Sequence, residues 1–131
     1  MVKACAIALM GLSVVHMLVL GADALGHLPG WLALDLWTLD HWRPLADQPL
    51  PVALSGAAFW STLGSFAAPA AILGGLILHM AVRGQRVPVA VGWGLLVWLM
   101  LAALVVEPSG FPAGAIVAGL LVFALHRQTV V

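Results

Sequence analysis

Apolar residues along this chain gather into four runs, each long enough to form a helix across a membrane. A membrane-spanning helix needs about 20 mostly apolar residues. Lipid-exposed strands and loops are excluded, because their backbone groups would have no hydrogen-bond partners. The four runs cover residues 4–21, 57–81, 89–106 and 110–125. The pattern therefore predicts an all-α integral membrane protein with four transmembrane helices.

The lengths of the links predict how these helices pair. Residues 82–88 join the second helix to the third, and residues 107–109 join the third to the fourth. Because helices joined by short links are usually antiparallel neighbours, we expect both pairs to pack in this way. The whole chain, residues 1–131, is then a single domain built as an antiparallel four-helix bundle.

The link between the first two helices differs from the others in length and composition. It holds Trp31, Trp37 and Trp42, interleaved with leucines. An isolated strand would have no pairing partner here, and indole rings favour the level of the lipid headgroups. We therefore expect residues 29–43 to form a short element that lies in the membrane interface.

Composition supports the membrane class. The chain is 63% hydrophobic and 8% charged, with a mean hydropathy of +1.12. A soluble domain of this size could not enclose so much apolar surface. The net charge is zero and Lys and Arg do not cluster with aromatic residues, so no nucleic-acid partner is expected. The single cysteine, Cys5, excludes an internal disulfide.

Charged residues are divided between the segments that flank the apolar runs. The carboxylates fall in the first and third links: Asp23, Asp35, Asp40, Asp47 and Glu107. Four of the five Lys and Arg residues fall in the other segments: Lys3, Arg83, Arg86 and Arg127. By the positive-inside rule, both chain termini are expected in the cytoplasm, with the Trp-rich segment outside.

An alternative reading makes residues 1–24 a cleaved signal peptide, because Lys3 precedes an apolar run and Ala22-Asp23-Ala24 has a small-x-small pattern. The run is longer than the usual core of a signal peptide and contains His16. We therefore expect an uncleaved first helix.

His16 is the first candidate functional residue, since it is ionisable and lies deep within an apolar run. Such residues are costly in a membrane and usually face the bundle interior. In one interpretation His16 exchanges a proton, with Asp23 or Glu107 as its partner. In the other, which we favour, a neutral His16 is hydrogen-bonded to a hydroxyl or a backbone carbonyl of a neighbouring helix.

The second apolar run supplies further polar groups near the middle of the membrane. Pro69 lacks an amide hydrogen, so we expect a kink that releases the carbonyl of Ser65. The candidate ligand-binding residues are His16, Ser61, Ser65, Pro69 and, from the third run, Trp98.

Ligands for a metal are sparse in this sequence. Cys5, His79, Met80 and His126 are expected at a similar depth, but their spacing matches no metal motif. We therefore expect no metal site, and no cofactor is indicated.

Two stretches carry a family resemblance: FWSTLGSFAAPAAILGGL, from Phe59 to Leu76, and RGQRVPVAVGWGLLVWLMLAALVVEPSGFP, from Arg83 to Pro112. Together with Gly11 and His16 in the first helix, they resemble a family of small bacterial four-helix membrane proteins of unknown function. The resemblance covers almost the whole chain. It implies a multi-pass protein of the bacterial inner membrane and transfers no catalytic residue.

Two classes of function remain open from the sequence. In the leading hypothesis, the protein lies in membrane lipid and binds a hydrophobic small molecule or a partner membrane protein, in a groove beside Pro69, Ser65 and His16. A homo-oligomer could form through stripes of small residues on the second or fourth helix. In the alternative, the protein is a small membrane enzyme of the isomerase or proton-transfer type that acts on a lipid-like substrate, with His16 as acid or base.

Overall fold

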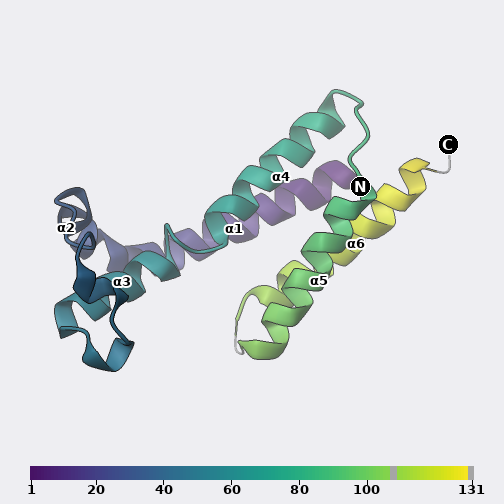
Figure 1. Ribbon diagram of the computed structural model, residues 1–131. Coiled ribbons are helices and arrows are strands. Elements are labelled where there is room, and N and C mark those ends of the chain that lie inside the picture. Colours follow the sequence, from purple (N-terminus) through teal and green to yellow (C-terminus); the bar gives the residue numbers. More distant parts are fainter. Residues whose placement is uncertain (107–108, 130–131) are drawn as a thin grey trace. The chain divides into compact units, whose positions relative to one another are not determined.

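The computed structural model describes residues 1–106 and 109–129, and none of these residues forms a strand. The ribbon in Figure 1 is built from α-helices joined by short links and single turns of 3₁₀ helix. The α-helices are α1 Val2–Ala24, α2 Leu28–Leu32, α3 Leu50–Ser61, α4 Ala67–Val82, α5 Val89–Val105 and α6 Phe111–Thr129. The all-helical fold class predicted from the sequence is confirmed.

Two of the helical segments are long and apolar enough to cross a membrane. One covers the 31 residues Val2–Leu32, and the other covers the 18 residues Phe111–Gln128. Helices α3, α4 and α5 are also apolar, but they have 12, 16 and 17 residues. The antiparallel bundle of four membrane spans stays a prediction.

The chain divides into two compact units. Unit 1 consists of Met1–Val14 and Pro69–Val131, and unit 2 consists of Val15–Ala68. The first part of α1 therefore belongs to unit 1 and the rest of α1 belongs to unit 2.

The apolar run 57–81 forms two helices in the structure rather than the continuous helix expected from the sequence. Helix α3 ends at Ser61, because Thr62 leaves the helical region with φ −123° and ψ −98°. Gly64 then turns the chain closely around the end of α3: a Cβ at this position would lie 2.7 Å from the Phe59 ring. Pro69 lies in the first turn of α4, where its missing N–H leaves no bond unmade, so the expected kink at Pro69 is replaced by the earlier break.

In unit 1, α5 and α6 pack along each other in antiparallel directions. A Cβ at Gly92, near the start of α5, would lie 3.0 Å from Val122, near the end of α6. At the other end of the pair, a Cβ at Gly114 would lie 3.1 Å from Leu99. Small residues thus let the two backbones approach closely. The small-residue stripe expected on the fourth helix serves, at Gly114, a contact within the chain.

The first part of α1 lies beside α4 in unit 1. A Cβ at Gly74 would lie 2.7 Å from Cγ of Met10 and 3.1 Å from the carbonyl oxygen of Ala6. Ala6 and, on α4, Ile77 have at most 1% of their surface exposed. Figure 1 shows the two helices running side by side.

In unit 2, Trp31 docks α2 against α3. Its indole N–H donates a hydrogen bond of 2.9 Å to the Ser55 hydroxyl. Its ring meets the edge of Phe59, with centroids 5.6 Å apart, and His27 stacks on its other side. One tryptophan of the Trp-rich segment is therefore a packing residue, whereas Trp37 and Trp42 are exposed.

The rest of the Trp-rich segment is held by local polar bonds. The side-chain amide of Gln48 donates to the carbonyls of His41 and Arg43, at 3.0 and 2.8 Å. Arg43 also forms an ion pair of 3.0 Å with Asp40. These bonds fold the segment into 3₁₀ turns at Leu39–Trp42 and Leu45–Asp47.

Candidate functional site

His16 bonds to the end of a neighbouring helix within unit 2. Its Nε2 donates a hydrogen bond of 3.0 Å to the backbone carbonyl of Ser61, since a carbonyl can only accept. Ser61 is the last residue of α3, and the last carbonyls of a helix have no partner inside that helix. The half-buried imidazole therefore ties α1 to the end of α3 by satisfying a backbone group.

Hydroxyl groups at this helix break are also bonded to nearby backbone. The hydroxyls of Ser61 and Thr62 both donate to the carbonyl of Ala58, at 3.1 and 2.6 Å. The Ser65 hydroxyl donates to the carbonyl of Thr62 at 2.5 Å and accepts the N–H of Ala67 at 3.2 Å. These bonds satisfy backbone groups released where α3 stops and α4 starts. Each of the three hydroxyl hydrogens thus has a structural acceptor.

The remaining candidates lie elsewhere. Asp23 is exposed in the last turn of α1, in unit 2. Pro69 belongs to unit 1, and so does Trp98, whose ring meets the edge of Phe111 with centroids 5.4 Å apart. Glu107 lies outside the described residues. Of the predicted set, the structure brings His16 and Ser61 into direct contact, and Ser65 follows in the same break.

The kind of bond that His16 makes was predicted, but its partner residue was not. A backbone carbonyl of a neighbouring helix was one of the two acceptors expected for a neutral His16. The structure uses the carbonyl of Ser61 rather than the Ser65 carbonyl expected from a kink at Pro69. The signal that could have shown this is the stretch Ser61-Thr62-Leu63-Gly64-Ser65, because Ser, Thr and Gly clustered between two apolar segments are typical of a break between helices. A break before Gly64 leaves the carbonyls of the preceding turn free for an outside donor.

Possible metal ligands are scattered in the described part of the chain, where no group of three or more His, Cys, Asp or Glu side chains gathers. Cys5 is buried in α1, and His79 is exposed on α4. His126 lies against Trp93, whose indole N–H donates to its Nε2 at 3.4 Å.

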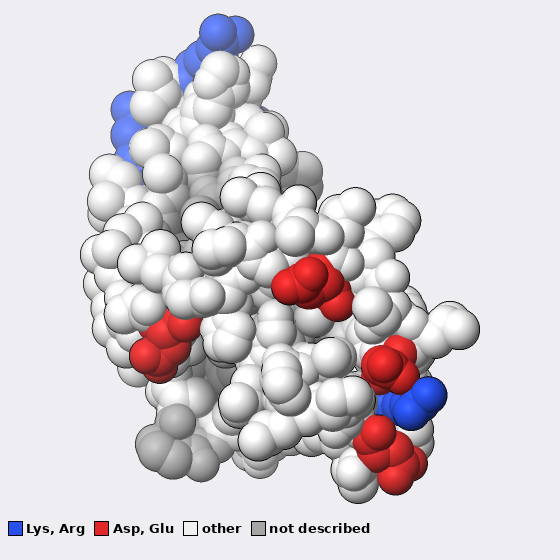
Figure 2. All heavy atoms as spheres, turned by 90° about the vertical axis from the view of Figure 1, so that its left-hand side faces the viewer, with Lys and Arg blue, Asp and Glu red and all other residues white. Residues whose placement is uncertain are grey.

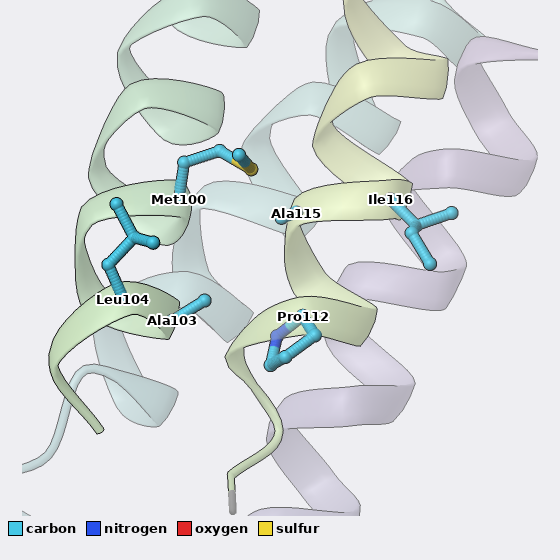
Figure 3. A pocket seen from close by; sticks show the side chains of 6 residues that line it. All are labelled: Met100, Ala103, Leu104, Pro112, Ala115 and Ile116. Atoms are coloured by element: carbon cyan, nitrogen blue, oxygen red, sulfur yellow. The ribbon is translucent and has the colours of Figure 1, made fainter. Parts of the chain in front are cut away.

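Two of the hollows that the described residues form lie on unit 1. The apolar hollow lies between α5 and α6, and Figure 3 shows the Met100 side chain extending across it toward α6. Its lining is entirely apolar: Met100, Ala103, Leu104, Pro112, Ala115 and Ile116. The basic hollow is lined by the end of α4, the link that follows and the end of α6: Ala81, Gly84, Gln85, Arg86, Arg127 and Gln128. The two hollows differ in chemistry, and neither includes a residue predicted as a ligand-binding site.

Charge follows the division into units. All the described carboxylates belong to unit 2, together with Arg43, and the other four Lys and Arg residues belong to unit 1. Figure 2 shows the acidic side chains standing apart from one another, with one basic side chain among them. Because they are separated, these acids form no cluster that could hold a cation.

No protein-family model, curated protein or solved structure matches this chain.

Proposed function

We propose that this chain is a multi-pass integral membrane protein of a bacterial inner membrane, with four spans and both termini in the cytoplasm. The proposal is supported by large apolar side chains that face outward from the helices. Leu18 on α1 is 72% exposed, Leu104 on α5 is 78% exposed and Ile116 on α6 is 67% exposed. Large apolar side chains exposed in this number mark a membrane or interaction surface. A bilayer would cover it with lipid.

The shorter helices are compatible with this proposal. Helices α4 and α5 would span about 25 Å, which a bilayer accommodates by modest thinning. The predicted second span, residues 57–81, is broken between α3 and α4. Broken spans are tolerated where other groups satisfy the freed backbone. His16 and the hydroxyls of the break provide such groups.

We further propose that the protein binds a hydrophobic molecule in the membrane, either a lipid-like small molecule or a helix of a partner membrane protein. The observation that carries this proposal is the apolar hollow, whose six lining residues offer only apolar contacts. The polar groups of the helix break argue for binding rather than catalysis, because His16 and the hydroxyls already have backbone partners.

Native mass spectrometry of the purified protein tests the proposal. We expect a hydrophobic compound to remain bound to the wild type and to be lost from Ala103→Trp, because the indole would fill the apolar hollow. Ala113→Trp, on an exposed position of α6 that does not line this hollow, should keep the compound. Equal binding in both variants would contradict the proposal. If the ligand is instead a helix of a partner membrane protein, a photo-crosslinking residue at position 104 should become attached to that protein.

The same measurement separates binding from the alternative, a small membrane enzyme that uses His16 as acid or base. An enzyme would convert its substrate in the wild type and leave it unconverted in His16→Ala. Because an isomer has the same mass as its substrate, the released compound is compared by chromatographic retention and fragmentation. The same compound in both preparations supports binding, and a different isomer or compound in the variant supports the enzyme.

A further inference from the structure

The basic hollow is built where α4 ends. Gly84 has φ +70°, and two backbone bonds close the helix: Gly84 N–H to the carbonyl of Ala81 at 3.4 Å, and Gln85 N–H to the carbonyl of Met80 at 2.9 Å. This arrangement is a Schellman motif, in which the last carbonyls of the helix are already bonded. Because these carbonyls are bonded, the C-terminus of α4 places less negative potential at the hollow.

Unit 1 carries positive charge without a balancing acid in its described residues. Arg86, from the link after α4, and Arg127, from the end of α6, both line the basic hollow, and Arg83 follows α4 directly. The Arg127 guanidinium lies 4.3 Å from the centre of the Phe123 ring. A ring holds the guanidinium in place without neutralising it. Two guanidinium groups around one hollow therefore remain available for an anion.

Gln128 sets a second requirement for the ligand of the basic hollow. Its side-chain Oε1 is buried and has no hydrogen-bond donor among the described residues. Buried polar atoms are nearly always bonded. Gln128 lines the hollow, so rotation of its side-chain amide toward the hollow would let a ligand hydroxyl satisfy this oxygen.

The surroundings of the basic hollow fit the membrane interface. Trp93 and Phe123 are each 49% exposed on the neighbouring turns of α5 and α6. Indole rings favour the headgroup level, and basic pockets between membrane helices on the cytoplasmic side suit lipid headgroups. The exposed apolar side chains beside the arginines would contact acyl chains.

We propose that the basic hollow binds the phosphodiester of an anionic phospholipid with a hydroxylated headgroup. The two arginines pair with the phosphate, and the headgroup hydroxyl donates to Oε1 of Gln128. We assign the bound phosphate to a lipid, and not to free phosphate, because we propose that the chain lies in a membrane; this assignment rests on the proposed function.

Lipid retention by the whole protein tests this inference. In nanodiscs that contain equal amounts of phosphatidylglycerol and phosphatidylcholine, native mass spectrometry should show that phosphatidylglycerol is preferentially retained. Arg86→Gln and Arg127→Gln should each lower that preference by about fivefold, since a basic residue at the surface contributes about this factor. The Lys variants should lose less, because they keep the charge without the bidentate fork.

Control variants show whether a loss of lipid preference arises at the basic hollow. Arg43→Gln removes an arginine of unit 2 and should leave lipid preference unchanged. Gln128→Leu should lower binding of phosphatidylglycerol but not of phosphatidic acid, which lacks the headgroup hydroxyl. Circular dichroism checks that each variant is folded. Equal losses in Arg43→Gln and Arg127→Gln, or no loss in the double variant Arg86→Gln/Arg127→Gln, would overturn the inference.

Inorganic phosphate distinguishes the two sources of the anion. If an excess of phosphate leaves phosphatidylglycerol bound, the site recognises the lipid. Full displacement by phosphate would overturn the lipid assignment. Ala103→Trp alters only the apolar hollow, so this variant should still retain phosphatidylglycerol. Loss of the hydrophobic compound with retention of phosphatidylglycerol, or the reverse, shows which of the two proposals fails.

Discussion

His16 illustrates how one polar side chain in an apolar helix can be satisfied by a backbone atom. The bond to the Ser61 carbonyl links the middle of α1 to the end of α3. In a membrane the alternative for that carbonyl is an unsatisfied acceptor in an apolar medium. The residue is thus explained by packing alone, before any chemical role is invoked.

For this single residue we predict that His16→Ala lowers the free energy of unfolding by about 0.5–2 kcal/mol, the range found for polar contacts between membrane helices. His16→Gln should lose less, since its amide can still donate. Thermal unfolding in detergent, followed by circular dichroism, measures the difference. His79→Ala, at an exposed position on α4, is the matched control and should have little effect. Similar losses for His16→Ala and His79→Ala would rule out a special role for the bond.

Two elements end with the same backbone motif but with different residues at the key position. Gly84 follows the end of α4 with φ +70°, and Leu34 follows the end of α2 with φ +65°. In α2, Leu34 N–H bonds to the carbonyl of Trp31 at 3.1 Å, and Asp35 N–H bonds to the carbonyl of Gly30 at 2.9 Å. The left-handed conformation costs an L-residue about 1–2 kcal/mol, so α2 ends under strain that α4 avoids.

Exchanging these residue types should therefore have opposite effects. Leu34→Gly should raise the free energy of unfolding by about 0.5 kcal/mol, because relief of strain exceeds the extra chain entropy of glycine. Gly84→Ala should lower it by about 1 kcal/mol. Chemical denaturation of the two variants beside the wild type is the measurement. A loss of stability in Leu34→Gly as large as that in Gly84→Ala would refute the argument.

For the whole molecule, the division of charge between units 1 and 2 predicts the orientation of the chain in the proposed membrane arrangement. In unit 1, Arg86 and Arg127 meet at the basic hollow, which places the end of α6 beside the link between α4 and α5. The positive-inside rule then predicts that this end faces the cytoplasm.

Cysteine labelling in cells measures this orientation. In a Cys5→Ser background, Ala46→Cys should react with a membrane-impermeant maleimide added outside, and Gln85→Cys should react only after the membrane is permeabilised. Both positions are exposed, and both substitutions leave the charges unchanged. Labelling of Gln85→Cys in intact cells would reverse the predicted topology.

The sequence predicted much of this architecture and less of its detail. Apolar run length predicted α5 and α6 to within a few residues, because nothing in those runs competes with helix formation. The break after Ser61 was not predicted, since it depends on Gly64 fitting against the rings of Phe59 and Trp60. The partner of His16 was not identified for a similar reason, because every residue carries a carbonyl and only the break makes this one available.

The direction of the His16 bond also decides which ring nitrogen can meet another group. Because Nε2 holds its hydrogen in the bond to Ser61, a neutral ring keeps its lone pair on Nδ1. The second nitrogen is therefore an acceptor, and a donor placed against it would bond to α1 without displacing the connection between α1 and α3.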